Sequence, residues 1–102
     1  MRKMFTIYGI KNCDSCKKAI KHFGSKAVFW DIRTRPLSKE VLENFHVTFG
    51  DKLVNINSKT WRMLSSTEKL IPSVELLRGF PTLMKRPVVE CSETLHRTVG
   101  WN

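Results

Sequence analysis

Apolar and polar positions alternate at the start of the chain and then change period. Aromatic and β-branched residues alternate with polar ones over Met4–Tyr8, which predicts a strand. After a break at residues 9–12, apolar residues recur at the spacing of one helix face, namely Cys16, Ala19, Ile20 and Phe23. Gly24 ends that helix, and the apolar run Ala27–Ile32 predicts a second strand. A helix that joins two such strands makes them parallel, with a right-handed crossover.

The middle of the chain, residues 36–80, carries mostly helical signals. Ser38 is the predicted N-cap of a helix with an apolar stripe. Ser65 and Glu68 fit a capping box, in which each side chain accepts a hydrogen bond from the backbone N–H of the other residue. Ser73 follows a proline and is the predicted cap of another short helix.

The last part of the chain returns to strand signals. Val88–Glu90 follows Pro87, and Leu95–Val99 supplies a second short strand. Ser92-Glu93 between them favours a turn, so these residues predict a β-hairpin. The pattern over the whole chain is therefore strand, helix, strand, a mostly helical segment and a hairpin.

Composition and charge narrow the class of protein but not its partner. A chain of 102 residues with 41% hydrophobic and 26% charged residues is typical of one folded domain. Three cysteines cannot form a fully paired disulfide framework, so we expect free thiols and a cytoplasmic protein. No apolar run is long enough to span a bilayer, so we expect no membrane partner. The net charge of +9 favours an anionic partner without choosing among nucleic acids, small anions and acidic proteins.

The pair of thiols in Cys13-Asp14-Ser15-Cys16 is the most informative chemical feature. The pair begins a predicted helix, where unsatisfied N–H groups and the helix dipole favour a thiolate at Cys13. Lys11 and Lys17 add positive potential, whereas Asp14 opposes it. Cys16 lies one turn deeper, on the apolar stripe, and should be more buried and less ionised. Cys13 is therefore the predicted nucleophile, and Cys16 the thiol that resolves the mixed disulfide.

Two other interpretations of this pair exist. The two cysteines can be small apolar core residues, because cysteine is often buried. They can also be half of a zinc site, which needs about four ligands. Cys91 and one of the histidines, His22, His46 or His96, would have to complete such a site. The chain has no second closely spaced pair, so we expect no metal.

Four segments in the right order resemble the arsenate reductase (ArsC)/Spx superfamily, and most closely its short YffB-like members. Tyr8–Ala19, which includes the thiol pair, resembles the start of that family. Thr60–Leu64 resembles the segment after its inserted helices. Pro81–Val88 resembles its most distinctive motif, and Val99–Trp101 resembles its terminal valine-glycine-aromatic sequence.

The resemblance implies an α/β, thioredoxin-like fold. A single domain would span residues 1–102, with the helical segment 36–80 as an insertion and without the last helix of the family. The resemblance also implies a cis peptide at Pro87 and places Arg86 beside the active cysteine. An arginine there can stabilise a thiolate and bind an oxyanion or a carboxylate. The further binding residues that we expect are Lys11, Asn12 and Arg97, the last as an oxyanion-binding arginine.

The family resemblance leads to an expected function as well. We expect a small thiol-disulfide oxidoreductase with Cys13, Cys16 and Arg86 as catalytic residues, reduced by glutathione or a glutaredoxin. Its substrate would be an oxyanion or a disulfide, and it would bind no cofactor. Family arsenate reductases carry another arginine in the segment corresponding to residues 53–59, where this chain has none. The alternative is an Spx-like redox-sensing regulator that binds RNA polymerase and uses the thiol pair as a switch.

Overall fold

The computed structural model describes residues 4–92 and 97–100. It divides into two units, which we call the sheet unit and the helical unit. The sheet unit contains residues 4–35 together with the described residues from 86 onward, and the helical unit contains residues 36–85. Each unit is described by itself. No helix in the described part of the chain is long and apolar enough to cross a membrane.

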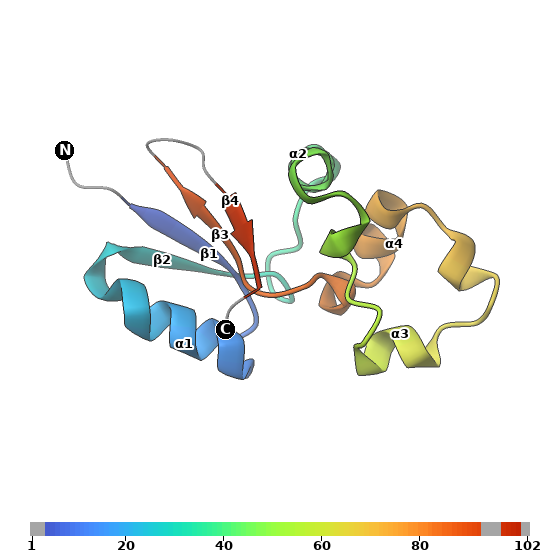
Figure 1. Ribbon diagram of the computed structural model, residues 1–102, viewed down its shortest axis with the longest axis horizontal. Coiled ribbons are helices and arrows are strands. Elements are labelled where there is room, and N and C mark those ends of the chain that lie inside the picture. Colours follow the sequence, from blue (N-terminus) through green and yellow to red (C-terminus); the bar gives the residue numbers. More distant parts are fainter. Residues whose placement is uncertain (1–3, 93–96, 101–102) are drawn as a thin grey trace. The chain divides into compact units, whose positions relative to one another are not determined.

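The sheet unit is a mixed sheet with one helix against it (Figure 1). The strand order is β2-β1-β3-β4; β1 pairs with β2 in parallel, whereas β1–β3 and β3–β4 are antiparallel. The elements in chain order are β1 (Phe5–Gly9), α1 (Asp14–Phe23), the 3-10 turn η1 (Gly24–Lys26), β2 (Ala27–Asp31), β3 (Val88–Cys91) and β4 (Arg97–Val99). The predicted strand-helix-strand and the hairpin are therefore confirmed. The predicted hairpin turn extends to Glu93, which lies outside the described residues.

Alternation along the strands gives the sheet two different faces. Ile7 on β1 lies directly opposite Val89 on β3, and both pack with Ala19 of α1 in a buried apolar cluster. Five partly buried apolar residues pack against that cluster: Phe5, Ile20, Phe23, Ala27 and Phe29. The neighbouring strand positions face the other way. There Tyr8 contacts Trp30, with ring centroids 5.8 Å apart. The sheet thus anchors α1 by its apolar side and fixes where the helix begins.

The helical unit is built from short helices and turns. They are α2 (Lys39–Phe49), η2 (Gly50–Leu53), α3 (Lys59–Met63), η3 (Glu68–Leu70), α4 (Ser73–Gly79) and η4 (Pro81–Leu83). Its buried core includes Leu42, Phe45, Leu53, Leu77, Leu83 and Met84. An isolated antiparallel bridge, Val54 to Met84, ties the loop after η2 to the end of the unit.

Serine side chains cap several of these elements. The Ser38 hydroxyl accepts a hydrogen bond from the N–H of Val41 (3.3 Å) at the start of α2, as predicted. The predicted capping box also forms. The N–H of Ser65 donates to the Glu68 carboxylate (2.8 Å), and the N–H of Glu68 donates to the Ser65 hydroxyl (3.1 Å). This box begins only the three-residue turn η3, because the apolar periodicity that would extend a helix is missing there.

One predicted cap is wrong. The N-cap of α4 is Pro72, and Ser73 is the first residue of the helix. The Ser73 hydroxyl instead donates a hydrogen bond to Oδ1 of Asp51, at 2.9 Å. A contact between residues far apart in the sequence has replaced the local cap, which local pattern alone does not reveal.

Candidate active site

Cys13 stands at the junction between β1 and α1. It is the N-cap of α1, with extended backbone angles of φ −87° and ψ 123°. Its N–H donates to the carbonyl of Ile10 (3.1 Å), and its carbonyl accepts the first hydrogen bond of the helix from the N–H of Lys17 (3.0 Å). The thiol is partly exposed. The backbone therefore holds a reactive group at the positive end of the helix dipole.

Cys16 is completely buried, as its place on the apolar stripe predicts. Its sulfur lies directly against the backbone of Gly9, the last residue of β1. A Cβ atom at residue 9 would stand 2.3 Å from the Sγ of Cys16 and 3.3 Å from its Cβ. Any larger residue would have to displace the helix or the thiol, so Gly9 positions the buried cysteine. The sequence prediction missed this role, because a glycine after an apolar strand is also typical of a simple turn.

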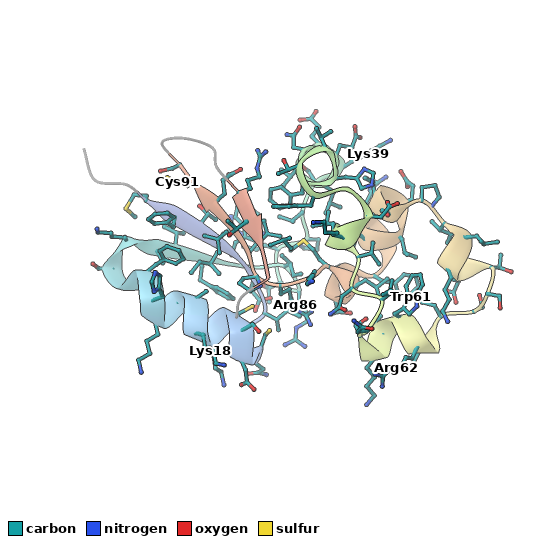
Figure 2. All side chains as sticks on the ribbon, viewed as in Figure 1. Lys18, Lys39, Trp61, Arg62, Arg86 and Cys91 are labelled. Atoms are coloured by element: carbon teal, nitrogen blue, oxygen red, sulfur yellow. The ribbon has the colours of Figure 1, made fainter. Side chains whose placement is uncertain are left out.

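Arg86 and Pro87 come to the thiols from the other end of the chain. They are joined by a cis peptide bond, which confirms the isomer that the family resemblance implies. Pro87 is fully buried, and the next residue, Val88, begins β3 opposite Tyr8 of β1. Arg86 is partly exposed and lies just before that strand (Figure 2). The pairing of β3 with β1 thus carries Arg86 to the end of the sheet where α1 begins.

The pKa values of the two thiols are shifted in opposite directions. Partial burial raises the pKa of Cys13, but stabilisation of the thiolate outweighs it, so the net pKa is lowered. The stabilising groups, from the largest effect down, are the backbone N–H and the thiol of Cys16, the positive charge of Arg86 and the N–H of Ser15. Burial, opposed by the N–H of Ile10, raises the pKa of Cys16 to about 12, and the neighbouring Cys13 adds to this increase.

This arrangement separates a nucleophile from a proton donor. The ionised form of Cys13 is favoured, and the thiol of Cys16 donates a hydrogen bond to it. A thiolate is the reactive form in attack on disulfides and other electrophiles. Arg86 adds a positive charge next to that thiolate, where an anionic group could also be bound.

Comparison with known proteins identifies the family of the chain. The family model described as ArsC family matches residues 8–102, which is most of the chain. The chain belongs to the ArsC family. A protein of Haemophilus influenzae described only as uncharacterized is 38% identical over 94 residues, covering 84% of this chain and 82% of that protein.

Solved structures support the same assignment within the ArsC family. The structure of a protein named YffB has a TM-score of 0.85 and 27% identity, and the match covers 97% of this chain and 92% of that one. An ArsC-related protein from Brucella melitensis has a TM-score of 0.74 and 33% identity, with 97% and 88% of the two chains covered. The predicted thioredoxin-like α/β fold and the likeness to short YffB-like members are thereby confirmed.

The other predicted binding residues of this ArsC-family chain lie in different surroundings. Lys11 and Asn12 are exposed in the turn between β1 and α1, immediately before Cys13. Arg97 on β4 is directly opposite Glu90 on β3, and its Nε donates to the Glu90 carboxylate at 2.5 Å. This ion pair uses one of the five N–H donors of the guanidinium and holds Arg97 over β3, whereas the charge of Arg86 acts on both Cys13 and Cys16. Opposite charges on facing hairpin strands were the available sequence signal for that ion pair.

The third cysteine is separate from the thiol pair. Cys91 is buried at the end of β3, opposite Phe5 of β1. It lines a small apolar cavity of about 180 Å³ together with Phe23 and Val89. In residues 4–92 and 97–100, no group of three or more His, Cys, Asp or Glu side chains is placed to hold a metal ion. His96, one of the histidines that the zinc interpretation names, lies outside the described residues.

Proposed function

We propose that this ArsC-family protein is a thiol-disulfide oxidoreductase with Cys13 as its nucleophile. The observation that carries the proposal is the placement of the two thiols, with Cys13 partly exposed at the N-cap of α1 and Cys16 buried against Gly9. This placement lowers the pKa of Cys13 and raises that of Cys16 to about 12. Such a difference assigns the attacking and the resolving role within one pair. Membership of a family whose solved relatives include an arsenate reductase-related protein supports it.

For a disulfide substrate, the proposed reaction has two thiol exchanges. In the first, the Cys13 thiolate attacks one sulfur of a substrate disulfide, forms a mixed disulfide and releases the other half as a thiolate. In the second, Cys16 loses its proton as it attacks the sulfur of Cys13, which releases the remaining half of the substrate. The two electrons given up by Cys13 and Cys16 have then reduced the substrate. Two glutathione molecules, or a reduced glutaredoxin, restore the dithiol and are themselves oxidised.

Arg86 is proposed to act on the negative groups of this reaction. Its charge lowers the pKa of Cys13 and can also bind the anionic partner, whether an oxyanion such as arsenate or a carboxylate of glutathione. The substrate is thus proposed to be an oxyanion or a disulfide, and a glutathionylated protein is one such disulfide. Lys11 and Asn12 are proposed to contribute at the exposed side of Cys13, and a reducing cytoplasm is the proposed location.

The test is the rate of alkylation at each cysteine as a function of pH, with the modified sites mapped by mass spectrometry. We expect Cys13 to react below the ordinary thiol pKa of about 8.5, and Cys16 to stay protected in the folded protein. Arg86→Gln should raise the pKa of Cys13, whereas Arg33→Gln, at an exposed position after β2, should not. Equal titration of all three cysteines, or an unchanged Cys13 in Arg86→Gln, would contradict the proposal.

Turnover separates this proposal from the regulator alternative. An oxidoreductase consumes glutathione-linked reducing equivalents repeatedly when a glutathionylated protein or arsenate is supplied. A redox switch is oxidised once per molecule and then changes its affinity for RNA polymerase. An activated Cys13 without turnover of any such substrate would therefore favour the switch.

A further inference from the structure

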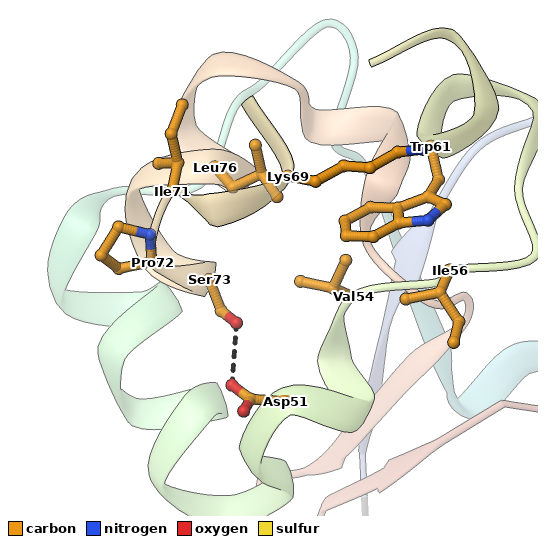
Figure 3. Close-up of a pocket in the computed structure, with 9 residues that line it drawn as sticks. All are labelled: Asp51, Val54, Ile56, Trp61, Lys69, Ile71, Pro72, Ser73 and Leu76. Atoms are coloured by element: carbon orange, nitrogen blue, oxygen red, sulfur yellow. Dashed lines mark hydrogen bonds between the residues drawn. The ribbon is translucent and has the colours of Figure 1, made fainter. Parts of the chain in front are cut away.

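A second site lies in the helical unit, away from the cysteines in the sequence. A pocket of about 300 Å³ is formed by residues of η2, α3, η3 and α4, and we call it the Trp61 pocket (Figure 3). Val54 and Leu76, only 8% and 2% exposed, belong to its apolar lining. The indole of Trp61 forms one side. This volume is at the lower end of the range for small-molecule sites, which is enough for one ring or branched side chain with a polar group.

Apolar side chains are also left in water around this pocket. Ile56 is 60% exposed and Ile71 is 38% exposed, and both line it. Single exposed apolar residues are ordinary, but here they adjoin a hollow that is already apolar inside. A ligand that fills the hollow would remove both side chains from water. The pocket therefore favours a ligand with an apolar body.

Charged groups stand at two ends of the Trp61 pocket. The ammonium of Lys69 lies over the Trp61 ring, 5.5 Å from its centroid. Among the described residues, no carboxylate lies within ion-pair distance of Lys69. Figure 3 shows Asp51 at the opposite end, where its Oδ1 accepts hydrogen bonds from the Ser73 hydroxyl (2.9 Å) and from the His46 ring (3.0 Å). Both of these hydrogen bonds use the same oxygen, so Oδ2 can accept one from a ligand.

We propose that the Trp61 pocket binds an apolar side chain adjacent to a carboxylate, as in the apolar C-terminal residue of a peptide. The apolar side chain would occupy the space between Trp61 and Leu76. The carboxylate would lie beside Lys69, and the amide N–H of the same residue would face Asp51. In this orientation the ligand carboxylate faces the ammonium of Lys69, and the ligand N–H faces the carboxylate of Asp51. The reverse orientation would place the ligand carboxylate next to that of Asp51.

The test uses three probes that carry different parts of the proposed ligand. N-acetylphenylalanine has the ring, the amide N–H and the carboxylate, its amide N-acetylphenylalaninamide lacks the charge, and acetate keeps only the carboxylate. Each is titrated into the ¹⁵N-labelled full chain, and backbone shift changes are followed. We expect saturable changes at Trp61, Ile71 and Ser73 with N-acetylphenylalanine, weaker binding of the neutral amide, and none of acetate at these residues.

Two variants separate the contribution of charge from that of apolar contact to ligand binding, and a third variant is the matched control. Lys69→Gln should weaken binding of N-acetylphenylalanine about 2- to 5-fold and leave the neutral amide unchanged, because it removes only an exposed charge. Ile56→Ser should weaken both ring-containing probes alike, because it removes apolar contact. Lys59→Gln, which removes another exposed lysine of the same unit, should change neither affinity.

Several results would overturn this assignment. One is the absence of saturable shifts at Trp61, Ile71 and Ser73 with any probe. A second is equal affinity for the anionic and the neutral probe. A third is a set of shifts centred on Asn55, Asn57 and Lys85, which line a neighbouring hollow instead. Because none of these readouts depends on Cys13, the result is independent of the proposed thiol chemistry.

Discussion

The sheet unit and the helical unit hold their polar groups in different ways. In the sheet unit, the thiol site is made by backbone placement: Cys13 caps a helix through its main chain, and Cys16 fits against Gly9 because that residue has no side chain. In the helical unit, exposed side chains accept hydrogen bonds from backbone N–H groups, as in the Ser38 cap and the Ser65–Glu68 box. Tight packing of the first kind tolerates little change, whereas exposed caps can be lost one at a time.

Element length explains part of this difference. Helices α3 and α4 have only five and seven residues, which is too short for stability in isolation. The Ser58 hydroxyl caps α3 by accepting a hydrogen bond from the N–H of Trp61 (3.1 Å), and the buried Leu76 and Leu77 hold α4 in the unit. Helix α1 is longer, and its buried stripe packs on the sheet. The start of α1 therefore needs no side-chain cap, and the thiol of its N-cap residue, Cys13, is left available for chemistry.

The largest expected effect is the loss of thiol chemistry in the sheet unit. Cys13→Ser should abolish formation of a mixed disulfide with oxidised glutathione, because the partly exposed thiol with the lowered pKa is removed. Cys16→Ser should instead accumulate the adduct at Cys13, since the resolving thiol is gone. Intact-mass and peptide-mapping mass spectrometry would measure both. An adduct on Cys16 or Cys91 in the wild-type protein would reverse the assignment.

The next effect tests how tightly the sheet unit is packed. Gly9→Ala should lower the free energy of unfolding by about 1–3 kcal/mol, because the new Cβ overlaps the Cys16 sulfur. Gly79→Ala in the helical unit should be neutral or stabilising by about 0.4–1 kcal/mol, because nothing lies within 4 Å of its Cβ position. Denaturant unfolding of both variants gives the comparison.

A double variant identifies the clash itself. In Gly9→Ala combined with Cys16→Ala, the sulfur is absent, and the new Cβ keeps its contacts with the Cβ of residue 16 (3.3 Å) and with the Phe29 ring (3.6 Å). The two substitutions should then cost less together than the sum of their separate costs. Strict additivity would mean that Gly9 is needed for another reason.

A smaller effect concerns pH and works in opposite directions at the two thiols. The raised pKa of Cys16 keeps its proton in the folded state after the unfolded chain has released it. Between the free-thiol pKa and about pH 12, stability should therefore fall by about 1 kcal/mol per pH unit from this group. The lowered pKa of Cys13 adds stability above the free-thiol pKa, and this is lost as pH falls through its folded value.

The measurement is the pH dependence of the unfolding free energy in wild type and Cys16→Ala. Only the slopes are compared, so the cost of the cavity left by the substitution does not enter. The decline above pH 9 should be shallower in Cys16→Ala. Parallel slopes would show that the buried thiol does not control this dependence.

The smallest effect tests the helical unit. Ser38→Ala should cost about 1 kcal/mol of stability, because the N–H of Val41 loses its cap. Ser66→Ala, at an exposed neighbour of the capping-box serine, is the matched control and should be close to neutral. Neither substitution should move the alkylation pKa of Cys13. A change there would mean that loss of the Ser38 cap also affects Cys13.

The sequence predicted local features well and distant ones poorly. The apolar stripe of α1 and the Ser38 cap depend on spacings within a few residues, and both are as expected. The contact of Gly9 with Cys16 was missed because it depends on how closely a helix packs on a strand. Ser73 was misassigned because Asp51, a distant partner, competes for its hydroxyl.

The candidate site shows the same division between local and distant effects. The order of burial and ionisation at the thiols follows from the start of a helix and its apolar stripe, so residues alone predicted it. Arg86 is far from Cys13 in the chain, and only the family resemblance pointed to it. The Trp61 pocket had no sequence signal, because its lining comes from short turns without periodicity.

The strand order also decides when the site can be completed during synthesis. Strand β1 lies between β2, which follows it closely in the chain, and β3, which is formed by residues 88–91. The first strand, helix and second strand can associate early as the chain leaves the ribosome, but one edge of β1 stays open until residues 88–91 have emerged. Closing so long a loop is entropically costly and slow. Arg86 is synthesised just before β3, so a nascent chain would carry both thiols before it has the charge that helps to activate one of them.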